Sequence, residues 1–226
     1  MRSILVVAAH PDDEALGCGG TLARLSREGA SIHVAFLADG VFSRDGEQGE
    51  QQQELLIRRS AAQAACASMG VGSVSFDNFP DNRMDTSALL DIAKTVEGLI
   101  EKYQPDTVFT HHGGDVNIDH RRIHEAVSVA CRPQSTSVVK TVLFFEVPSS
   151  TEWQFPGSTP VFSPNWFVDI SDTLAKKLAA LESYSHEMRA WPHPRSIEGV
   201  THLARWRGAT VGVDAAEAFM LGRQVV

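Results

Sequence analysis

The sequence predicts an α/β fold, in which a single Rossmann-like domain carries a mostly parallel sheet flanked by helices. Short apolar runs alternate along the chain with segments of helical periodicity, a pattern typical of βαβ units. The chain has 226 residues, of which 43% are hydrophobic and 21% are charged, enough for one large core. No repeat or low-complexity tract interrupts this pattern, so we expect one domain over residues 1–226.

The first strand is predicted at 3–9, because six small or apolar residues in a row indicate a strand buried on both faces. Further strands are predicted at 31–38, 73–76, 107–110 and 138–145. Helices are predicted at 13–28, 50–69, 85–103 and 119–131. Each of these helices has a stop signal just beyond its end, namely Gly29, Gly70, Pro105 and Pro133.

The amino-acid composition of the chain changes after Glu146. Four prolines stand among Ser, Thr and aromatic residues in 147–165, which predicts an ordered loop or small cap region. The remainder is expected to hold a helix over 169–189, a rigid turn at 191–195, and two short segments at 198–207 and 215–221. Of the four tryptophans, most are expected in the core, and one is a candidate for stacking on a sugar ring.

Composition excludes several classes of function. The net charge of −8 argues against a nucleic-acid binder and against an anionic membrane surface as partner. No run approaches the ~18 apolar residues of a membrane span. The apolar run before His10 is too short for a signal peptide. Cys18, Cys66 and Cys131 are odd in number and far apart, so we expect reduced thiols and a cytoplasmic protein.

The end of the first predicted strand carries side chains suited to a metal. His10, Asp12, Asp13 and Glu14 follow the strand directly, where open α/β sheets bind their ligands. Carboxylates this close repel one another, and a cation relieves that repulsion. The alternative interpretation is that the two aspartates are plain helix caps.

A catalytic zinc needs about three protein ligands and one open position. His10 and Asp13 can supply two of them, and the third is expected from the histidine-rich segment 111–124, which follows another predicted strand. This segment offers His111, His112, His120 and His124. Histidine and carboxylate ligands without Cys fit Zn²⁺, and they fit Fe(II), Co(II) or Mn(II) almost as well.

The glycine run Gly17-Cys-Gly-Gly20 could suggest a dinucleotide-binding loop. It lacks the full glycine spacing, and the acidic segment before it would repel a pyrophosphate. We therefore interpret these glycines as allowing a helix to pack closely against the sheet.

Two sequence motifs of the chain resemble those of a known protein family. Ala9-His-Pro-Asp-Asp-Glu14, followed by the glycine run, resembles the start of the PIG-L/LmbE-like family of zinc-dependent N-acetyl-sugar deacetylases, and Asp115-Val-Asn-Ile-Asp-His120 resembles its second motif. The segments 79–83, 146–150 and 192–198 are similar to bacterial members, so the resemblance covers nearly the whole chain.

The resemblance implies that the metal is held by His10, Asp13 and His120, and that Asp12 is the general base. Many members carry a histidine three residues before the last ligand, where this chain has Asn117. An amide can donate to an oxyanion but cannot act as an acid, so the proton for the leaving amine would come from Asp12 or from another group such as His193.

Other residues are expected to support the ligands or touch the substrate. Glu14 and Asp119 are expected to orient the metal ligands without touching the metal themselves. Arg44 and Arg58 are candidate contacts to a sugar or phosphate, with solvated surface charge as the alternative. His193 and Arg195 stand between prolines and are candidates for lining the pocket. His124, one helical turn after His120, is a candidate fourth ligand.

The predicted reaction is hydrolysis of the acetamide of a small amino-sugar substrate of the N-acetylglucosamine type, with release of acetate. Three alternatives stay open: an amidase acting on a thiol-sugar conjugate or other acylated amine, a non-catalytic metal- or sugar-binding protein, and a nucleotide-sugar enzyme that keeps the acetyl group. The resemblance also implies a homo-oligomer, either a trimer or a hexamer.

Overall fold

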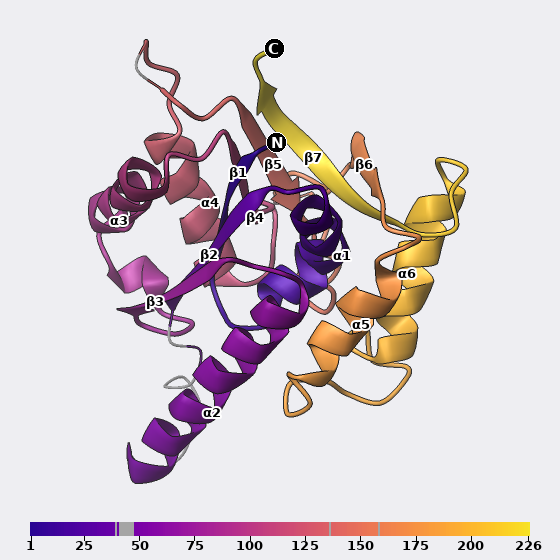
Figure 1. The fold of residues 1–226 in the computed structure, drawn as a ribbon. Helices are drawn as coiled ribbons and strands as arrows, with labels where there is room; N and C mark the ends of the chain where they lie inside the picture. The colour runs from indigo at the N-terminus through magenta and orange to yellow at the C-terminus, as the bar shows by residue number, and fades with distance from the viewer. Residues whose placement is uncertain (39, 41–47, 136, 158) are drawn as a thin grey trace.

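The computed structural model describes residues 1–38, 40, 48–135, 137–157 and 159–226. These residues form a seven-stranded sheet in the order β3-β2-β1-β4-β5-β7-β6 (Figure 1). The strands are β1 (Ser3–Ala8), β2 (Ser31–Ala38), β3 (Ser73–Phe79), β4 (Thr107–His111), β5 (Thr141–Phe145), β6 (Trp166–Asp169) and β7 (Ala216–Gln224). Strands β1 to β5 pair in parallel, and β7 runs antiparallel to both β5 and β6. The predicted α/β class with a mostly parallel sheet is confirmed.

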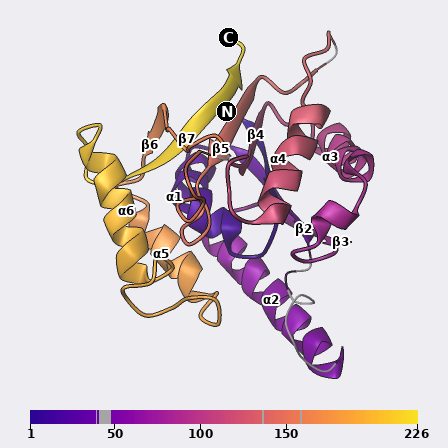
Figure 2. The ribbon, with the colours of Figure 1, turned by 180° about the vertical axis from the view of Figure 1, so that it is seen from behind.

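Helices cover both faces of this sheet (Figure 2). The core on one face is built with α1 (Asp13–Arg27), α2 (Gln48–Ser68), α5 (Leu174–Glu182) and α6 (Ile197–Ala209). The core on the other face is built with α3 (Leu89–Tyr103) and α4 (Ile118–Ala130). The N-terminal end of α2 projects beyond the rest of the molecule in both views.

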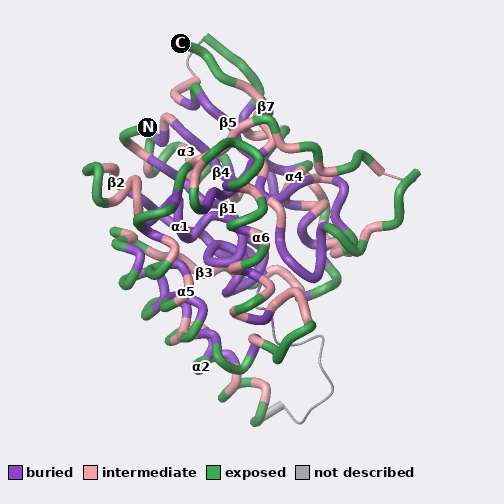
Figure 3. Tube along the Cα trace, turned by 90° about the vertical axis from the view of Figure 1, so that its right-hand side faces the viewer, coloured by how far each residue is buried: buried purple, intermediate pink, exposed green. Residues whose placement is uncertain are grey.

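Strand β1 shows why its sequence is continuously apolar. Ile4, Val6 and Ala8 pack into the core on the α1 side, and Leu5 and Val7 pack into the core on the α3 side. All five are at most 1% exposed, and Figure 3 shows buried segments running through the interior. A strand with helices on both faces has no polar side, so no alternation is visible in its sequence.

Two of the expected helices differ from the structure in their bounds. The helix predicted over 169–189 is wrong at both ends, because 166–169 forms β6 and helix α5 covers only Leu174–Glu182. Asp169 Oδ1 accepts from the backbone N–H of Ser171, which turns the chain before the helix begins. The helix predicted from residue 85 begins at Leu89, after a separate 3₁₀ turn at Met84–Thr86. The short segment expected at 215–221, for which no type of element was predicted, falls on β7 (Ala216–Gln224).

The glycine run packs α1 against its neighbours, as expected. A Cβ on Gly17 would lie 2.4 Å from the ring of Phe145, and one on Gly20 would lie 2.8 Å from Ile170. Both distances are below any real carbon–carbon contact, so larger residues would push α1 away from β5 and from the β6–α5 connection.

A buried ion pair joins α1 to the C-terminal part of the chain. Glu217 on β7 accepts from the backbone N–H groups of Gly20 and Thr21 at 2.9 and 2.6 Å. Lys177 on α5 donates to the carbonyl of Leu16 at 2.7 Å and to Glu217 at 2.5 Å. Because each buried charge is paired and hydrogen-bonded, its burial is tolerated.

Cys18, Cys66 and Cys131 are free thiols, and all three are buried. None of the helices in the described part of the chain combines the length and the apolar character that crossing a bilayer requires.

Candidate metal centre

The candidate site lies at the carboxyl ends of β1 and β4. The sheet order reverses between these two strands, since β2 and β3 follow on one side and β5 on the other. Such a switch point is where open α/β sheets leave a crevice for ligands. The segment after β1 brings His10 to Asp13, and the segment after β4 leads into α4 with His120.

The turn between β1 and α1 has a strained backbone, and the side chain of Glu14 holds it in place. Asp12 has a φ of 119°, a left-handed conformation that an aspartate seldom adopts. Its backbone N–H donates to Glu14 Oε2 at 3.1 Å, and the hydroxyl of Tyr184 donates to Glu14 Oε1 at 2.6 Å. Burial raises the pKa of Glu14 to about 8. Glu14 thus fixes the peptide that presents Asp12.

The three residues expected as ligands lie together. Ligand atoms of His10, Asp13 and His120 all lie within 4.8 Å of one another, and the three residues are buried. Asp13 Oδ2 is 3.5 Å from Nδ1 of His10 and 3.4 Å from Nε2 of His120. The three side chains therefore converge on one point, although about a hundred residues separate Asp13 from His120.

The chemistry of these donors fits a cation. His120 Nε2 is buried and has no hydrogen-bond partner, so this donor atom is available. Burial lowers the pKa of His120, but the carboxylates of Asp13 and Asp115 outweigh it and raise that pKa to about 9. The pKa of His10 is likewise raised, by hydrogen bonds to carboxylates that outweigh its burial. Without a metal, the nearby carboxylates favour the protonated forms of His10 and His120. A divalent cation bound by these histidines would displace the protons.

Carboxylates behind the two histidines fix the orientation of both rings. Asp115 Oδ1 is 3.2 Å from His120 Nδ1. Asp115 accepts in turn from the hydroxyls of Ser150 and, at 2.7 Å, of Thr151. On the other side, His10 Nε2 lies 3.0 Å from Asp119 and 3.1 Å from Asp81. Partners of this kind set which ring nitrogen faces a metal.

Asp12 stands beside the three residues but outside their group. Its Oδ2 accepts from Arg195 Nη1 at 3.0 Å, and the side chain lines a cavity of about 100 Å³ together with His10. Burial raises the pKa of Asp12 to about 6, against the opposing charge of the Arg195 guanidinium. A carboxylate with this pKa, next to a ligand cavity, is suited to accept a proton near neutral pH.

The other histidines of the 111–124 segment have structural contacts. His111 Nε2 accepts from the backbone N–H of Ala9 at 2.9 Å, and its ring stacks on His120 with centroids 3.9 Å apart. His112 Nε2 lies 2.9 Å from the carbonyl of Pro160, and His124 Nδ1 lies 3.0 Å from the carbonyl of His111. Only His120 of this segment belongs to the group with His10 and Asp13, among the residues that the structure describes.

Asn117 caps helix α4 with its oxygen and turns its nitrogen to the cavity. Oδ1 accepts from the backbone N–H of Asp119 at 2.8 Å, and Nδ2 donates to Asn82 Oδ1 at 3.1 Å. Asn117 and Asn82 both line the 100 Å³ cavity. The cap fixes which end of the amide faces the cavity, so Asn117 presents a donor.

Two expected substrate residues line the same cavity. Arg58 is buried, donates to the carbonyl of Gly40 and pairs with Glu187 at 3.1 Å. Arg195 reaches the cavity from the C-terminal part of the chain. The predicted contact Arg44 lies outside the described residues.

His193 lies in a second cavity of about 250 Å³, which shares Glu187 and Arg195 with the first. A cis peptide between Trp191 and Pro192 precedes His193, whose Nδ1 accepts from the backbone N–H of Arg195 at 3.1 Å. The expectation that most tryptophans lie in the core is wrong, because Trp153, Trp191 and Trp206 are 50%, 55% and 66% exposed.

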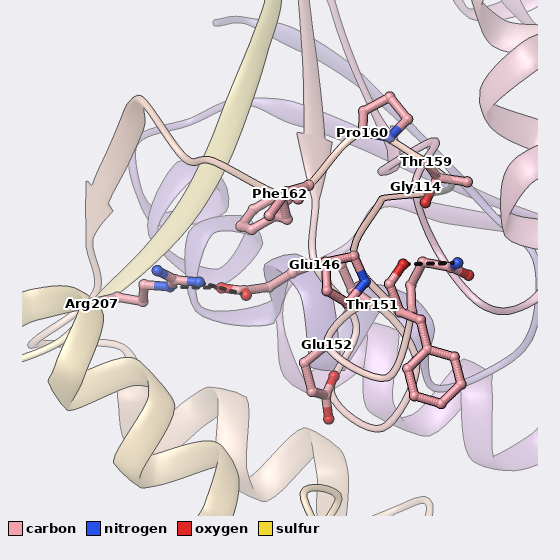
Figure 4. A pocket seen from close by; sticks show the side chains of 12 residues that line it. Gly114, Glu146, Thr151, Glu152, Thr159, Pro160, Phe162 and Arg207 are labelled. Carbon is pink, nitrogen blue, oxygen red and sulfur yellow. Dashed lines mark hydrogen bonds and ion pairs between the residues drawn. The ribbon is translucent and has the colours of Figure 1, made fainter.

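A separate cavity of about 300 Å³ is lined by residues from 151–156 and 159–162 and by Arg207 on α6 (Figure 4). Glu146 and Arg207 pair at its edge, with 2.8 and 2.7 Å contacts. It contains none of the predicted site residues, and the titratable groups gather instead around Asp12, so we assign the chemistry to the smaller cavity.

Sequence reasoning missed several residues of the site, among them Asp81, Asp115, Tyr184 and Glu187. Asp81 and Asp115 lie inside segments that resemble the family, and their place in these segments could have marked them as residues of the site. Tyr184 and Glu187 lie in an irregular segment after α5, and no pattern in the sequence distinguishes them.

Comparison with known proteins places these features in context. A family model described as GlcNAc-PI de-N-acetylase matches residues 5–131, which include the whole candidate ligand group. An uncharacterized deacetylase of Escherichia coli, YaiS, is 30% identical over 189 residues, covering 81% of this chain and 90% of the relative. A diacetylchitobiose deacetylase of Thermococcus kodakarensis is 29% identical over 196 residues, covering 83% and 70%.

One solved structure with a similar fold is described as an enzyme that catalyses a different reaction. The 4-carboxy-2-hydroxymuconate hydratase GalB of Pseudomonas putida superposes with a TM-score of 0.80 at 24% identity, covering 100% of this chain and 98% of that one. This likeness shows the fold alone.

Proposed function

The chain belongs to the PIG-L family, and from that premise we propose that it is a metal-dependent hydrolase that removes the acetyl group from an N-acetylated amino sugar. One observation carries the proposal. His120 Nε2, buried and without a hydrogen bond, lies 3.4 Å from Asp13 in one group with His10, while Asp12 lines the neighbouring cavity outside that group. Adjacent aspartates thus serve two separate tasks, one toward a metal and one toward a water molecule.

We assign His10, Asp13 and His120 as the residues that would hold the metal, and Zn²⁺ as the metal. Two imidazoles and one carboxylate form a donor set that zinc enzymes use, and Fe(II), Co(II) or Mn(II) would be accepted by the same set. When bound, such an ion lowers the pKa of a water molecule from 15.7 to about 7.

The chain's own residues supply proton transfer and orientation. Asp12 would accept the proton of the attacking water, and Arg195 holds its carboxylate in place. Asn117 Nδ2 would donate to the developing oxyanion, since its oxygen is committed to the helix cap. The proton for the leaving amine would return from Asp12, or come from His193 at the rim.

The substrate is proposed to be N-acetylglucosamine or a glycoside of it. Arg58, Arg195 and His193 line these two cavities, which share Glu187 and Arg195, and offer donors to sugar hydroxyls. The name of the Thermococcus kodakarensis relative supports this class of substrate. The thiol-sugar conjugates of the alternative hypothesis would occupy the same cavities, so only substrate profiling separates the two.

The test combines metal analysis with acetate release from N-acetylglucosamine and N,N′-diacetylchitobiose. We expect about one metal ion per chain and metal-dependent acetate release. Asp12→Asn should keep the metal and lose nearly all turnover, whereas His120→Ala should lose both. Loss of metal in Asp12→Asn would refute the division of roles, and absence of acetate release by the metal-loaded protein would refute the function.

Two broader expectations belong to the same proposal. The free, buried cysteines support a reducing compartment such as the cytoplasm. A trimer or hexamer, implied by the resemblance, is to be tested by light scattering coupled to size-exclusion chromatography.

A further inference from the structure

The loop after β5 contacts both parts of the candidate site through consecutive residues. Ser149 is buried, and its Oγ accepts from Nε of Arg195 at 2.6 Å. The same guanidinium donates from Nη1 to Asp12 Oδ2 at 3.0 Å. A single arginine therefore stands between Ser149 and the carboxylate expected to act as the general base.

The next two residues of the loop support a metal ligand instead. The hydroxyls of Ser150 and Thr151 both donate to the carboxylate of Asp115, the latter at 2.7 Å. Asp115 Oδ1 lies 3.2 Å from Nδ1 of His120. One short loop thus reaches the base and a metal ligand through separate sets of contacts.

The carboxylate of Glu152 folds back on the start of this loop. Its Oε1 accepts from the backbone N–H of Ser149 at 2.6 Å, and its Oε2 accepts from that of Ser150 at 3.3 Å. Ser149 has a φ of 66°, in the left-handed region that residues other than glycine seldom adopt. Such a conformation persists only where the surroundings fix it. Glu152 supplies part of that fixation.

The residues that contact Asp115 have a second anchor. The backbone N–H groups of Ser150 and Thr151 donate to the carbonyl of Val147 at 3.1 and 3.0 Å. Thr151 Oγ1 also accepts from the N–H of Val147 at 2.8 Å. The contacts with Asp115 should therefore survive the loss of Glu152, whereas the orientation of Ser149 should not.

We propose that Ser149 and Glu152 are positioning residues for the general base. Glu152 holds the turn that carries Ser149. Ser149 holds Arg195, whose guanidinium orients the carboxylate of Asp12. The metal ligand is supported separately, by the next two residues of the loop. The inference rests on the proposed function, since it takes Asp12 to accept the proton of the attacking water.

The experiment measures turnover and metal affinity in one set of variants. Acetate release from N,N′-diacetylchitobiose at saturating Zn²⁺ gives kcat, and competition with a chelating dye gives the Kd for Zn²⁺. Ser149→Gly removes the hydroxyl and permits the left-handed backbone. We expect its kcat to fall at least about tenfold and its Kd for Zn²⁺ to stay within about twofold. Retained zinc affinity also shows that the variant is folded, because the ligands come from the ends of two strands.

Variants of the neighbouring residues separate the two sets of contacts. Glu152→Ala should repeat the pattern of Ser149→Gly, and Glu152→Gln, which keeps an acceptor oxygen, should restore part of kcat. Thr151→Val should instead weaken Zn²⁺ binding, by about 10- to 100-fold, since it removes a donor to the carboxylate behind His120.

A double variant tests whether the two positioning residues act through the same group. Ser149→Gly combined with Glu152→Ala should lose no more turnover than the more affected single variant, because both losses act through Arg195. Losses that multiply would overturn this shared action. An unchanged kcat in either single variant, or a zinc affinity that falls together with kcat, would overturn the positioning role.

Glu146→Gln is the matched control. Glu146 is a carboxylate beside the same 300 Å³ cavity as Glu152, but it pairs with Arg207. Its kcat and its Kd for Zn²⁺ should both stay within about twofold of the wild type. Absence of acetate release by the metal-loaded wild type would refute the proposed function and this inference with it. An active wild type with unaffected variants would refute the inference alone.

Discussion

Arg195 Nη1 donates to Asp12 Oδ2 at 3.0 Å, although the two residues are 183 positions apart in the chain. Arg195 Nε also donates to Ser149 at 2.6 Å, so the guanidinium is held at two points. The segment after α5 thus completes a site whose other parts come from the ends of β1 and β4.

Arg195→Met should lower kcat/KM for acetate release by at least about tenfold while the bound metal stays unchanged. The substitution removes the group that orients the Asp12 carboxylate and leaves a buried acid without its partner. Arg195→Lys, which keeps the charge but not the fork of donors, should restore part of the loss. Unchanged kcat/KM in the Met variant would show that Asp12 is positioned without Arg195.

Metal binding should stabilise the folded protein. At a free Zn²⁺ concentration of about 100 times Kd, the free energy of unfolding should rise by about 2.7 kcal/mol. Thermal unfolding with and without Zn²⁺ should show this shift in the wild type and in Asp12→Asn, but not in His120→Ala. An equal shift in His120→Ala would place the ion elsewhere.

Gly17→Ala should destabilise the protein by about 1–3 kcal/mol, because its Cβ would lie 2.4 Å from the Phe145 ring. Gly98→Ala is the matched control on α3, where nothing lies within 4 Å of the added Cβ. It should stabilise the protein by up to about 1 kcal/mol through helix propensity. Chemical unfolding of the two variants checks both signs, and equal effects would contradict close packing at Gly17.

Acid should destabilise the fold through His33. Its ring nitrogens lie 2.7 and 2.9 Å from the hydroxyls of Ser73 and Ser75, and burial, with the charge of Lys102, lowers its pKa to about 4. In the unfolded chain His33 takes up a proton near pH 6.5. The unfolded state therefore holds more protons between pH 6.5 and 4, and the free energy of unfolding falls as the pH falls through this window.

We expect this contribution to be about 1–2 kcal/mol, since solvent screens part of it. His33→Gln should flatten the change in urea midpoint between pH 7 and pH 4.5. A wild-type midpoint that rises on acidification over that range, after correction with the variant, would reverse the predicted sign.

The place of the candidate ligand group could be predicted from the sequence, because His10 and Asp13 directly follow one predicted strand and the histidine-rich segment 111–124 follows another. The ends of parallel strands share one edge of a sheet, so the two segments are expected to meet there. The choice of His120 among the four histidines of that segment came from the family resemblance, and His120 is the one that lies with His10 and Asp13. The roles of Asp81 and Asp115 could not be assigned, since a buried carboxylate that orients a histidine has no sequence pattern of its own. They emerge only from distances such as the 3.2 Å between Asp115 and His120.

The C-terminal third was harder to predict for a related reason. Trp166–Asp169 is a strand of only four residues, too short to show a period, and it pairs with a strand some fifty residues later. The apolar run of β1 was clear because helices cover both of its faces. Contacts such as the one from Tyr184 to Glu14 join residues 170 positions apart, beyond the reach of any local signal.

The contacts of Glu217 and Lys177 with α1 bear on how the protein is made. The ribosome makes the N-terminus first, so the whole of α1 is synthesised long before Glu217. Until then the backbone N–H groups of Gly20 and Thr21 lack the acceptor that they have in the folded protein. The helix that carries Asp13 can therefore complete these contacts only after β7 has been synthesised. A nascent chain thus lacks two of the groups that hold α1 in place until Lys177 and Glu217 have both been made.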